Sequence, residues 1–100
     1  MIITDSVTIL FKKYTVGRDS NTRDDKGNLL YGQIDHIEQL ITLNEDAGLE
    51  QQKATLMHEM VHGLDALYSI GLKEKQVEKL GTALYMLVWD NPEMFAEDKL

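Results

Sequence analysis

The segment from Leu49 to Ser69 constrains the fold more than any other part of the chain. It contains no proline, and its apolar residues recur at the i, i+3, i+4, i+7 spacing of a helix with one buried side. These residues are Met57, Val61, Leu64 and Tyr68, with Leu56, Met60 and Leu67 widening the stripe. We therefore expect a long amphipathic helix. Gly63 inside it predicts that another element closely approaches its backbone.

The pentapeptide His58-Glu59-Met60-Val61-His62 falls inside this predicted helix. Histidines four positions apart share one helix face, with Cβ atoms about 5–6 Å apart, so both imidazoles can bind one metal ion. Glu59 is offset around the helix and can reach a water on the metal without becoming a ligand. This is the zinc metallopeptidase signature. Two of the chain's three histidines have this spacing, which favours a Zn2+ site over an ordinary solvated helix face.

Cysteine is absent from the chain, which bears on the kind of zinc site to expect. Closed structural zinc sites are usually rich in cysteine, whereas catalytic sites combine three protein ligands with an open position for water. The sequence therefore favours a catalytic site over a structural one.

A second amphipathic segment, from about Lys73 to Asp90, supplies candidates for the third ligand. The short connection through Ile70-Gly71-Leu72 predicts an antiparallel helical hairpin. Glu74 and Glu78 lie one turn apart, along the edge of the apolar stripe that such a pairing would bring towards the histidines.

Three acids compete for the role of third ligand. We favour Glu78, because it lies mid-helix among apolar residues, where an unpaired carboxylate is costly. Glu74 belongs to the first helical turn, where the helix dipole stabilises an acid without any metal. Asp65 shares a helix with both histidines, so it is better suited to accept a hydrogen bond from a ligand histidine.

The chain resembles a known family, the small metallopeptidases of the ImmA/IrrE type, and especially the short members encoded by phages and prophages. The resemblance covers roughly residues 29–92, and its one sharp motif is HExxH. It is carried by Leu30 to Asp35, Ile41-Thr42-Leu43, Gln52 to Asp65, and Val77 to Leu80 continuing to Asn91-Pro92.

The resemblance implies a gluzincin-like hydrolase in which His58, His62 and Glu78 bind zinc and Glu59 is the catalytic base. In such a site zinc lowers the pKa of its water to about 7. The base takes the proton of this water and passes it to the leaving nitrogen of the peptide. The glutamate segment departs from that of the longer members, and no helix-turn-helix or sensor domain accompanies the motif.

The first half of the chain is rich in β-branched and aromatic residues, which predicts strands. Val7 to Phe11 and Tyr14 to Val16 read as strand, with a short helix in part of this stretch as the alternative. Leu29 to Ile34 and Glu38 to Leu43 read as two strands that pair as a hairpin. Residues 17–28 contain no apolar side chain and carry turn residues, so we expect an exposed loop.

These elements predict an α+β fold with a single domain spanning residues 1–100. A small antiparallel sheet would pack on the HExxH helix and on the glutamate-bearing helix that follows, as in a minimal zincin-like domain. Pro92 predicts a last short helix that reaches about Lys99. Either Ile41-Thr42-Leu43 or Leu29-Leu30-Tyr31 could form an edge strand that receives a substrate backbone.

The net charge of −7, from 17 acids against 10 bases, argues against nucleic-acid binding. The sequence shows no secretion signal and no apolar span, so we expect no membrane contact and a cytoplasmic location. The absence of cysteine agrees with a cytoplasmic protein.

Two functional hypotheses follow. In the first, the chain is an intracellular zinc peptidase that cuts a specific protein partner, such as a transcriptional repressor. Tyr68 and Tyr85 are then the nearest candidates for the oxyanion donor, although a tyrosine at helical spacing is more often a core residue. In the second, the chain is a non-catalytic metal-binding interaction module of phage or prophage origin. The intact Glu59 favours the first hypothesis.

Overall fold

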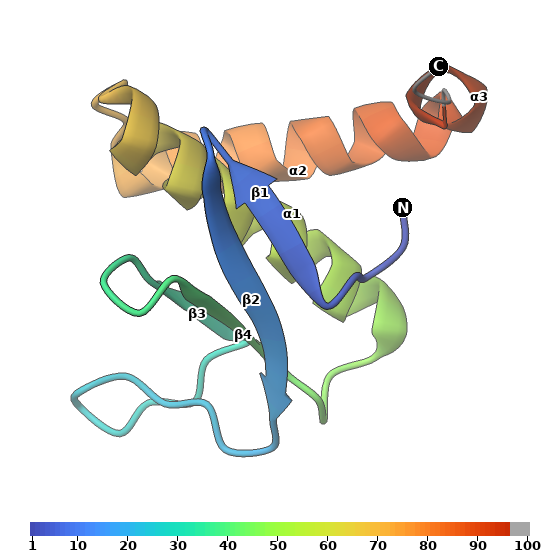
Figure 1. The fold of residues 1–100 in the computed structure, drawn as a ribbon. Helices are drawn as coiled ribbons and strands as arrows, with labels where there is room; N and C mark the ends of the chain where they lie inside the picture. The colour runs from blue at the N-terminus through green and yellow to red at the C-terminus, as the bar shows by residue number, and fades with distance from the viewer. Residues whose placement is uncertain (97–100) are drawn as a thin grey trace.

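The computed structural model describes residues 1–96 as an α+β fold, with a four-stranded sheet followed by three helices (Figure 1). This confirms the predicted fold class. The elements are β1 Ser6–Ile9, β2 Lys12–Asp19, β3 Gly32–Asp35, β4 Leu40–Asn44, α1 Leu49–Tyr68, α2 Glu74–Asp90 and α3 Pro92–Phe95. The expected final helix therefore begins at Pro92, and its predicted end at Lys99 lies outside the described residues.

The sheet has the strand order β1-β2-β4-β3 and is mixed rather than antiparallel. The pairs β1–β2 and β3–β4 are antiparallel hairpins, but β2 and β4 run parallel. The prediction of an antiparallel sheet was wrong on this point. The β3–β4 hairpin was predicted, but the β1–β2 hairpin was not, because its turn is made by Leu10 and Phe11 in positive-φ conformations (45° and 71°) that these residue types do not indicate. The predicted strand over Val7 to Phe11 therefore ends at Ile9. β4 returns between β2 and β3, and local sequence does not encode that insertion.

The order of the strands decides which of the two predicted edges is free. β4, which contains Ile41-Thr42-Leu43, is enclosed between β2 and β3. β3 is an outer strand, and Tyr31 extends its pairing because the Asn44 N–H donates to the Tyr31 carbonyl at 2.7 Å. The segment that begins near Leu29 therefore leads into a free edge.

The predicted loop over residues 17–28 lies three residues later in the chain and is better anchored than expected. β2 continues to Asp19, so the connection to β3 spans residues 20–31. Thr22 is fully buried, and its carbonyl accepts a hydrogen bond from the Leu30 N–H at 2.9 Å. An isolated bridge between Arg23 and Leu29 closes the exposed tip.

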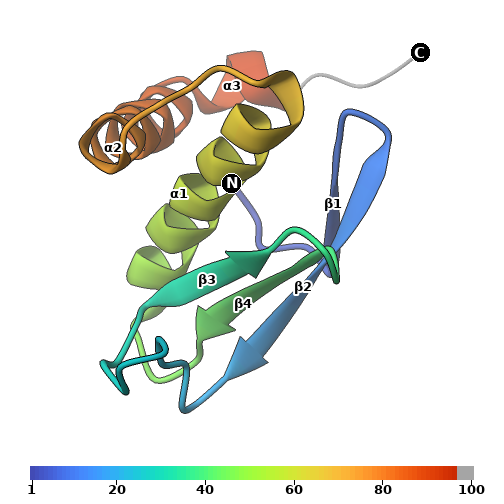
Figure 2. The same ribbon diagram turned by 90° about the vertical axis from the view of Figure 1, so that its left-hand side faces the viewer.

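One face of the sheet packs on α1, and α2 lies on the other side of α1 (Figure 2). The buried core comprises Ile9, Tyr14, Ile41, Leu43 and Leu56. Gly63 allows this packing, because a Cβ at this position would lie 2.7 Å from Ile9 Cδ1 and 3.5 Å from Ile34 Cδ1. The close approach predicted at Gly63 is confirmed, and the approaching element is the sheet.

The connection between α1 and α2 is held by one carboxylate. Asp65 Oδ1 accepts hydrogen bonds from the backbone N–H groups of Gly71 and Leu72, both at 2.8 Å. Ser69 ends α1 in the left-handed conformation, with φ of 53°. These contacts fix the predicted helical hairpin, which places the start of α2 beside the C-terminal half of α1. Among the helices of residues 1–96, none is long and apolar enough to cross a membrane.

Candidate metal centre

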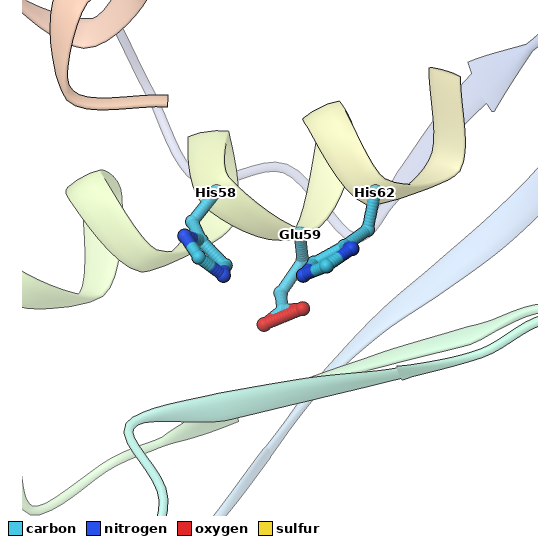
Figure 3. Close-up of side chains that lie close together, drawn as sticks. All are labelled: His58, Glu59 and His62. Carbon is cyan, nitrogen blue, oxygen red and sulfur yellow. The ribbon is translucent and has the colours of Figure 1, made fainter. Parts of the chain in front are cut away.

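His58 and His62 lie one turn apart on α1, and their rings are close together. The ring centroids are 4.9 Å apart with an interplanar angle of 72°. Figure 3 shows both imidazoles and the Glu59 side chain projecting from the same side of α1. One ligand atom from each of these three residues lies within 4.8 Å of the others, so the group could hold a metal ion. Both histidines are about one quarter exposed, which keeps the imidazoles accessible.

Glu59 is the buried member of this group, at 5 % exposure. Within residues 1–96, no protein group donates a hydrogen bond to its carboxylate. Burial raises the pKa of Glu59 from 4.5 to about 7, and the negative charge of Glu74 adds to the rise. A carboxylate whose pKa lies near neutrality can both accept and release a proton at physiological pH, as a general base must.

Glu74 brings a second carboxylate to the histidines, from the first turn of α2. Its Oε1 lies 3.3 Å from His58 Nε2, and its Oε2 lies 3.1 Å from His62 Nε2. Hydrogen bonds to protonated imidazoles have this length. In a tetrahedral site with bonds of about 2.0–2.1 Å to zinc, neighbouring ligand atoms also lie about 3.3 Å apart. The spacing therefore suits the set His58, His62 and Glu74 with or without an ion between them.

Gly81 lets α2 come close enough for this arrangement. A Cβ at Gly81 would lie 3.1 Å from His58 Cα and 3.5 Å from the His58 backbone nitrogen. The two helices thus touch at the first histidine, and Glu74 lies two turns earlier on α2. The side chain of Glu74 is itself 61 % exposed, so it can adjust to an ion.

Glu78, the acid favoured from the sequence, occupies a different place. It is exposed, so the argument from burial does not apply to it. It lines the same cleft as His58 and Glu59, but in the described part of the chain it makes no ion pair with either histidine. Asp65 hydrogen-bonds the backbone of the α1–α2 connection, and within residues 1–96 no hydrogen bond joins it to an imidazole.

A cleft of about 360 Å³ opens beside the histidines. Its walls come from the segment leading into β3, from α1 and from α2. It is lined by Leu30, Tyr31, Gly32, Gln51, Ala54, Thr55, His58, Glu59, Glu74, Glu78 and Thr82. The sequence suggested an edge strand near Tyr31 but did not predict that Tyr31 and Gly32 line a cleft with His58. This proximity depends on the strand order of the sheet.

The two tyrosines considered as oxyanion donors lie outside this cleft. Tyr85 donates a hydrogen bond of 2.6 Å to Glu50 Oε2, and this bond raises the pKa of Tyr85 to about 12. Tyr68 is 54 % exposed near the end of α1 and does not line the cleft. The third histidine, His36, is also remote from the site, and its Nδ1 lies 3.2 Å from the Tyr14 hydroxyl.

Comparison with known proteins adds no relative to this picture. No family model matches the chain, and searches of curated proteins and of solved structures likewise give no match. The functional argument therefore depends on the geometry of the site itself.

Proposed function

We propose that this chain is a zinc-dependent peptidase whose metal is bound by His58, His62 and Glu74, with Glu59 as the general base. The observation that carries the proposal is the position of the Glu74 carboxylate, which reaches both imidazole Nε2 atoms at 3.1–3.3 Å. The resemblance in sequence to ImmA/IrrE-type peptidases points to the same chemistry.

The donor set fits zinc. Two imidazole nitrogens and one carboxylate are the ligands of many catalytic zinc sites, and they leave a fourth position for water. In this ligand set Glu74 from α2 is the carboxylate ligand. Glu59, which follows His58 on α1, is therefore not needed as a ligand and can act as the base. When bound, zinc polarises the scissile carbonyl and makes water more acidic.

Glu59 performs the proton transfers in this proposal. Its carboxylate removes a proton from the attacking water as the new C–O bond forms at the peptide carbonyl. It then delivers that proton to the amide nitrogen as the C–N bond breaks, which releases a carboxylic acid and an amine. The burial that raises the pKa of Glu59 to about 7 suits both directions of transfer.

The free edge of β3 is suited to hold the substrate. In the antiparallel register, the backbone N–H and C=O groups of Tyr31, Gln33 and Asp35 point toward β4. The backbone groups of Gly32 and Ile34 therefore point outward, along the free edge of the sheet. An extended peptide can add to this edge through main-chain hydrogen bonds. Because Gly32 lines the cleft, the added strand would pass close to Glu59 and the histidines. The substrate is thus proposed to be a protein segment in extended conformation.

Zinc content per purified chain tests the ligand set. We expect about one zinc per chain after dialysis, a loss of most zinc in Glu74→Gln and retention in the matched variant Glu78→Gln. Retention in Glu74→Gln together with loss in Glu78→Gln would assign the ligand to Glu78 instead.

A cleavage assay then tests the reaction. We expect hydrolysis of a denatured protein by the zinc-loaded chain, and none by Glu59→Gln with its zinc retained. If neither protein hydrolyses the substrate, the non-catalytic metal-binding module is favoured.

A further inference from the structure

The cleft contains a carboxylate that the proposed reaction leaves without a role. Glu59 serves as base and Glu74 as ligand, but Glu78 lines the same cleft and is exposed. Within residues 1–96, Glu78 forms neither an ion pair nor a hydrogen bond with another side chain. Lys75 and Lys79 are its neighbours on α2, and neither lines the cleft.

When Glu59 is ionised, as a general base must be, the charges of the zinc-bound cleft leave one carboxylate without a cationic partner. A bound zinc dication is offset by the carboxylates of Glu59 and Glu74, while neutral imidazoles contribute no charge. No lysine or arginine lines the cleft in the described part of the chain. The Glu78 carboxylate is therefore available to pair with a cationic group of a bound ligand.

A second observation indicates that the cleft receives a ligand. Glu59 is 95 % buried, and its carboxylate has no hydrogen-bond partner within residues 1–96, although it lines the cleft. Its oxygen atoms open into the cleft rather than being sealed from it, so a bound ligand can supply the hydrogen bond that the described part of the protein does not. The cleft is also lined by Tyr31, an aromatic ring that is 61 % exposed and lies on the segment leading into the free edge of β3.

We propose that this cleft selects extended peptides that carry a lysine or arginine side chain, with Glu78 as the residue that determines specificity. The cationic group pairs with the Glu78 carboxylate while Tyr31 offers a ring face for a cation–π contact. This inference rests on the cleft of the proposed function, and it assigns the substrate class within it.

Binding of uncleaved peptides tests the proposal in metal-free protein, where no turnover occurs, and each measurement is repeated in a Glu74→Gln background so that the Glu74 carboxylate, no longer offset by zinc, cannot supply the preference. The probes are capped pentapeptides of valine and threonine that differ only at the central residue, which is lysine, glutamine or glutamate. Their affinities are measured by NMR titration of isotope-labelled wild type and of the variants Glu78→Gln and Glu78→Lys. Glu93→Gln is the matched control, because it removes one exposed carboxylate from α3, outside the cleft.

We expect the wild type to bind the lysine peptide about fivefold more tightly than the glutamine peptide, as for one partly screened ion pair. The preference should fall below about twofold in Glu78→Gln, reverse towards the glutamate peptide in Glu78→Lys, and persist in Glu93→Gln. Amide shifts should include Tyr31 and Gly32. A preference that survives in Glu78→Gln, or no preference in the wild type, would overturn the proposal, as would the absence of peptide binding.

The zinc measurement separates this inference from the proposed function. A protein that holds no zinc but prefers the lysine peptide through Glu78 would refute the peptidase and leave the specificity intact. A protein that holds zinc through Glu74 but has no lysine preference would refute the specificity alone. Loss of zinc in Glu78→Gln would make Glu78 a ligand and overturn its role in specificity.

Discussion

Gly81 on α2 touches the backbone of His58 on α1, and this contact sets the distance between the histidines and Glu74. The space for a side chain at Gly81 is limited, since an added Cβ would lie 3.1 Å from His58 Cα. Because the neighbouring atom is backbone rather than a flexible side chain, α2 must shift to make room.

Gly81→Ala therefore tests the link between helix packing and metal binding. Alanine gains about 1 kcal/mol of helix propensity, which offsets the steric cost in overall stability. We expect the free energy of unfolding to change little, while zinc affinity falls about two- to threefold, because a shift of a few tenths of an ångström in α2 is only partly compensated by the flexible Glu74 side chain. Isothermal titration with zinc measures this. Gly48→Ala, with no atom within 4 Å of the added Cβ, is the control, and equal affinity in both variants would contradict the link.

Metal removal should destabilise the protein. Zinc that binds only the folded state adds roughly 3 kcal/mol at a free concentration of about one hundred times Kd. For a domain of this size that corresponds to a rise in Tm of about 10 °C or more. Thermal unfolding with zinc and with a chelator measures the difference. His62→Ala should show the same Tm in both conditions, and a zinc-dependent rise in this variant would argue that the ion binds elsewhere.

The stability of the metal-free protein should depend on the protonation of Glu59. Its pKa is raised by folding from 4.5 to about 7, so the fold favours the protonated form. This contribution is fully present below pH 4.5 and is lost as the pH rises through 7. At about 1.4 kcal/mol per pH unit, the loss amounts to roughly 3 kcal/mol. Chemical denaturation of wild type and Glu59→Gln over this range measures it, and parallel pH profiles would contradict the assignment.

Gly32→Ala should destabilise the β3 wall of the cleft. An added Cβ would lie 2.5 Å from Thr55 Cγ2 and 2.9 Å from the carbonyl oxygen of Thr42, which is backbone. Overpacking of this kind typically costs about 1–3 kcal/mol. Urea denaturation measures the loss. Gly17→Ala is the control, because its nearest contact is an ordinary 3.8 Å to Leu40 Cδ1, and an equal effect at both glycines would argue against a specific clash at Gly32.

Sequence reasoning worked best where the determinants are local. The period of apolar residues predicted α1 to within one residue of its observed end at Tyr68, and the short connection predicted the helical hairpin. The spacing of His58 and His62 predicted their common face, which the structure shows.

The choice among acids depended on information that the sequence does not contain. Glu78 was favoured on the assumption that it is buried, but the edge of α2 that carries it borders an open cleft. Glu74 reaches the histidines because of how α2 crosses α1 at Gly81, which is a tertiary property. In the same way, the parallel pairing of β2 with β4 joins segments whose order no turn residue specifies.

The carboxylate of Asp65 that ties Gly71 and Leu72 has a consequence for the order of assembly. The two histidines and Glu74 all belong to one helical hairpin, so the contacts among them have short sequence separation and form with little loop-closure entropy. The Glu59 side chain, in contrast, projects from α1 toward a sheet that is built from pairings between distant segments (Figure 3). We therefore expect the proposed metal affinity and the raised pKa of Glu59 to depend on contacts at different ranges along the chain, so that a defect in the sheet lowers this pKa and leaves metal binding unchanged.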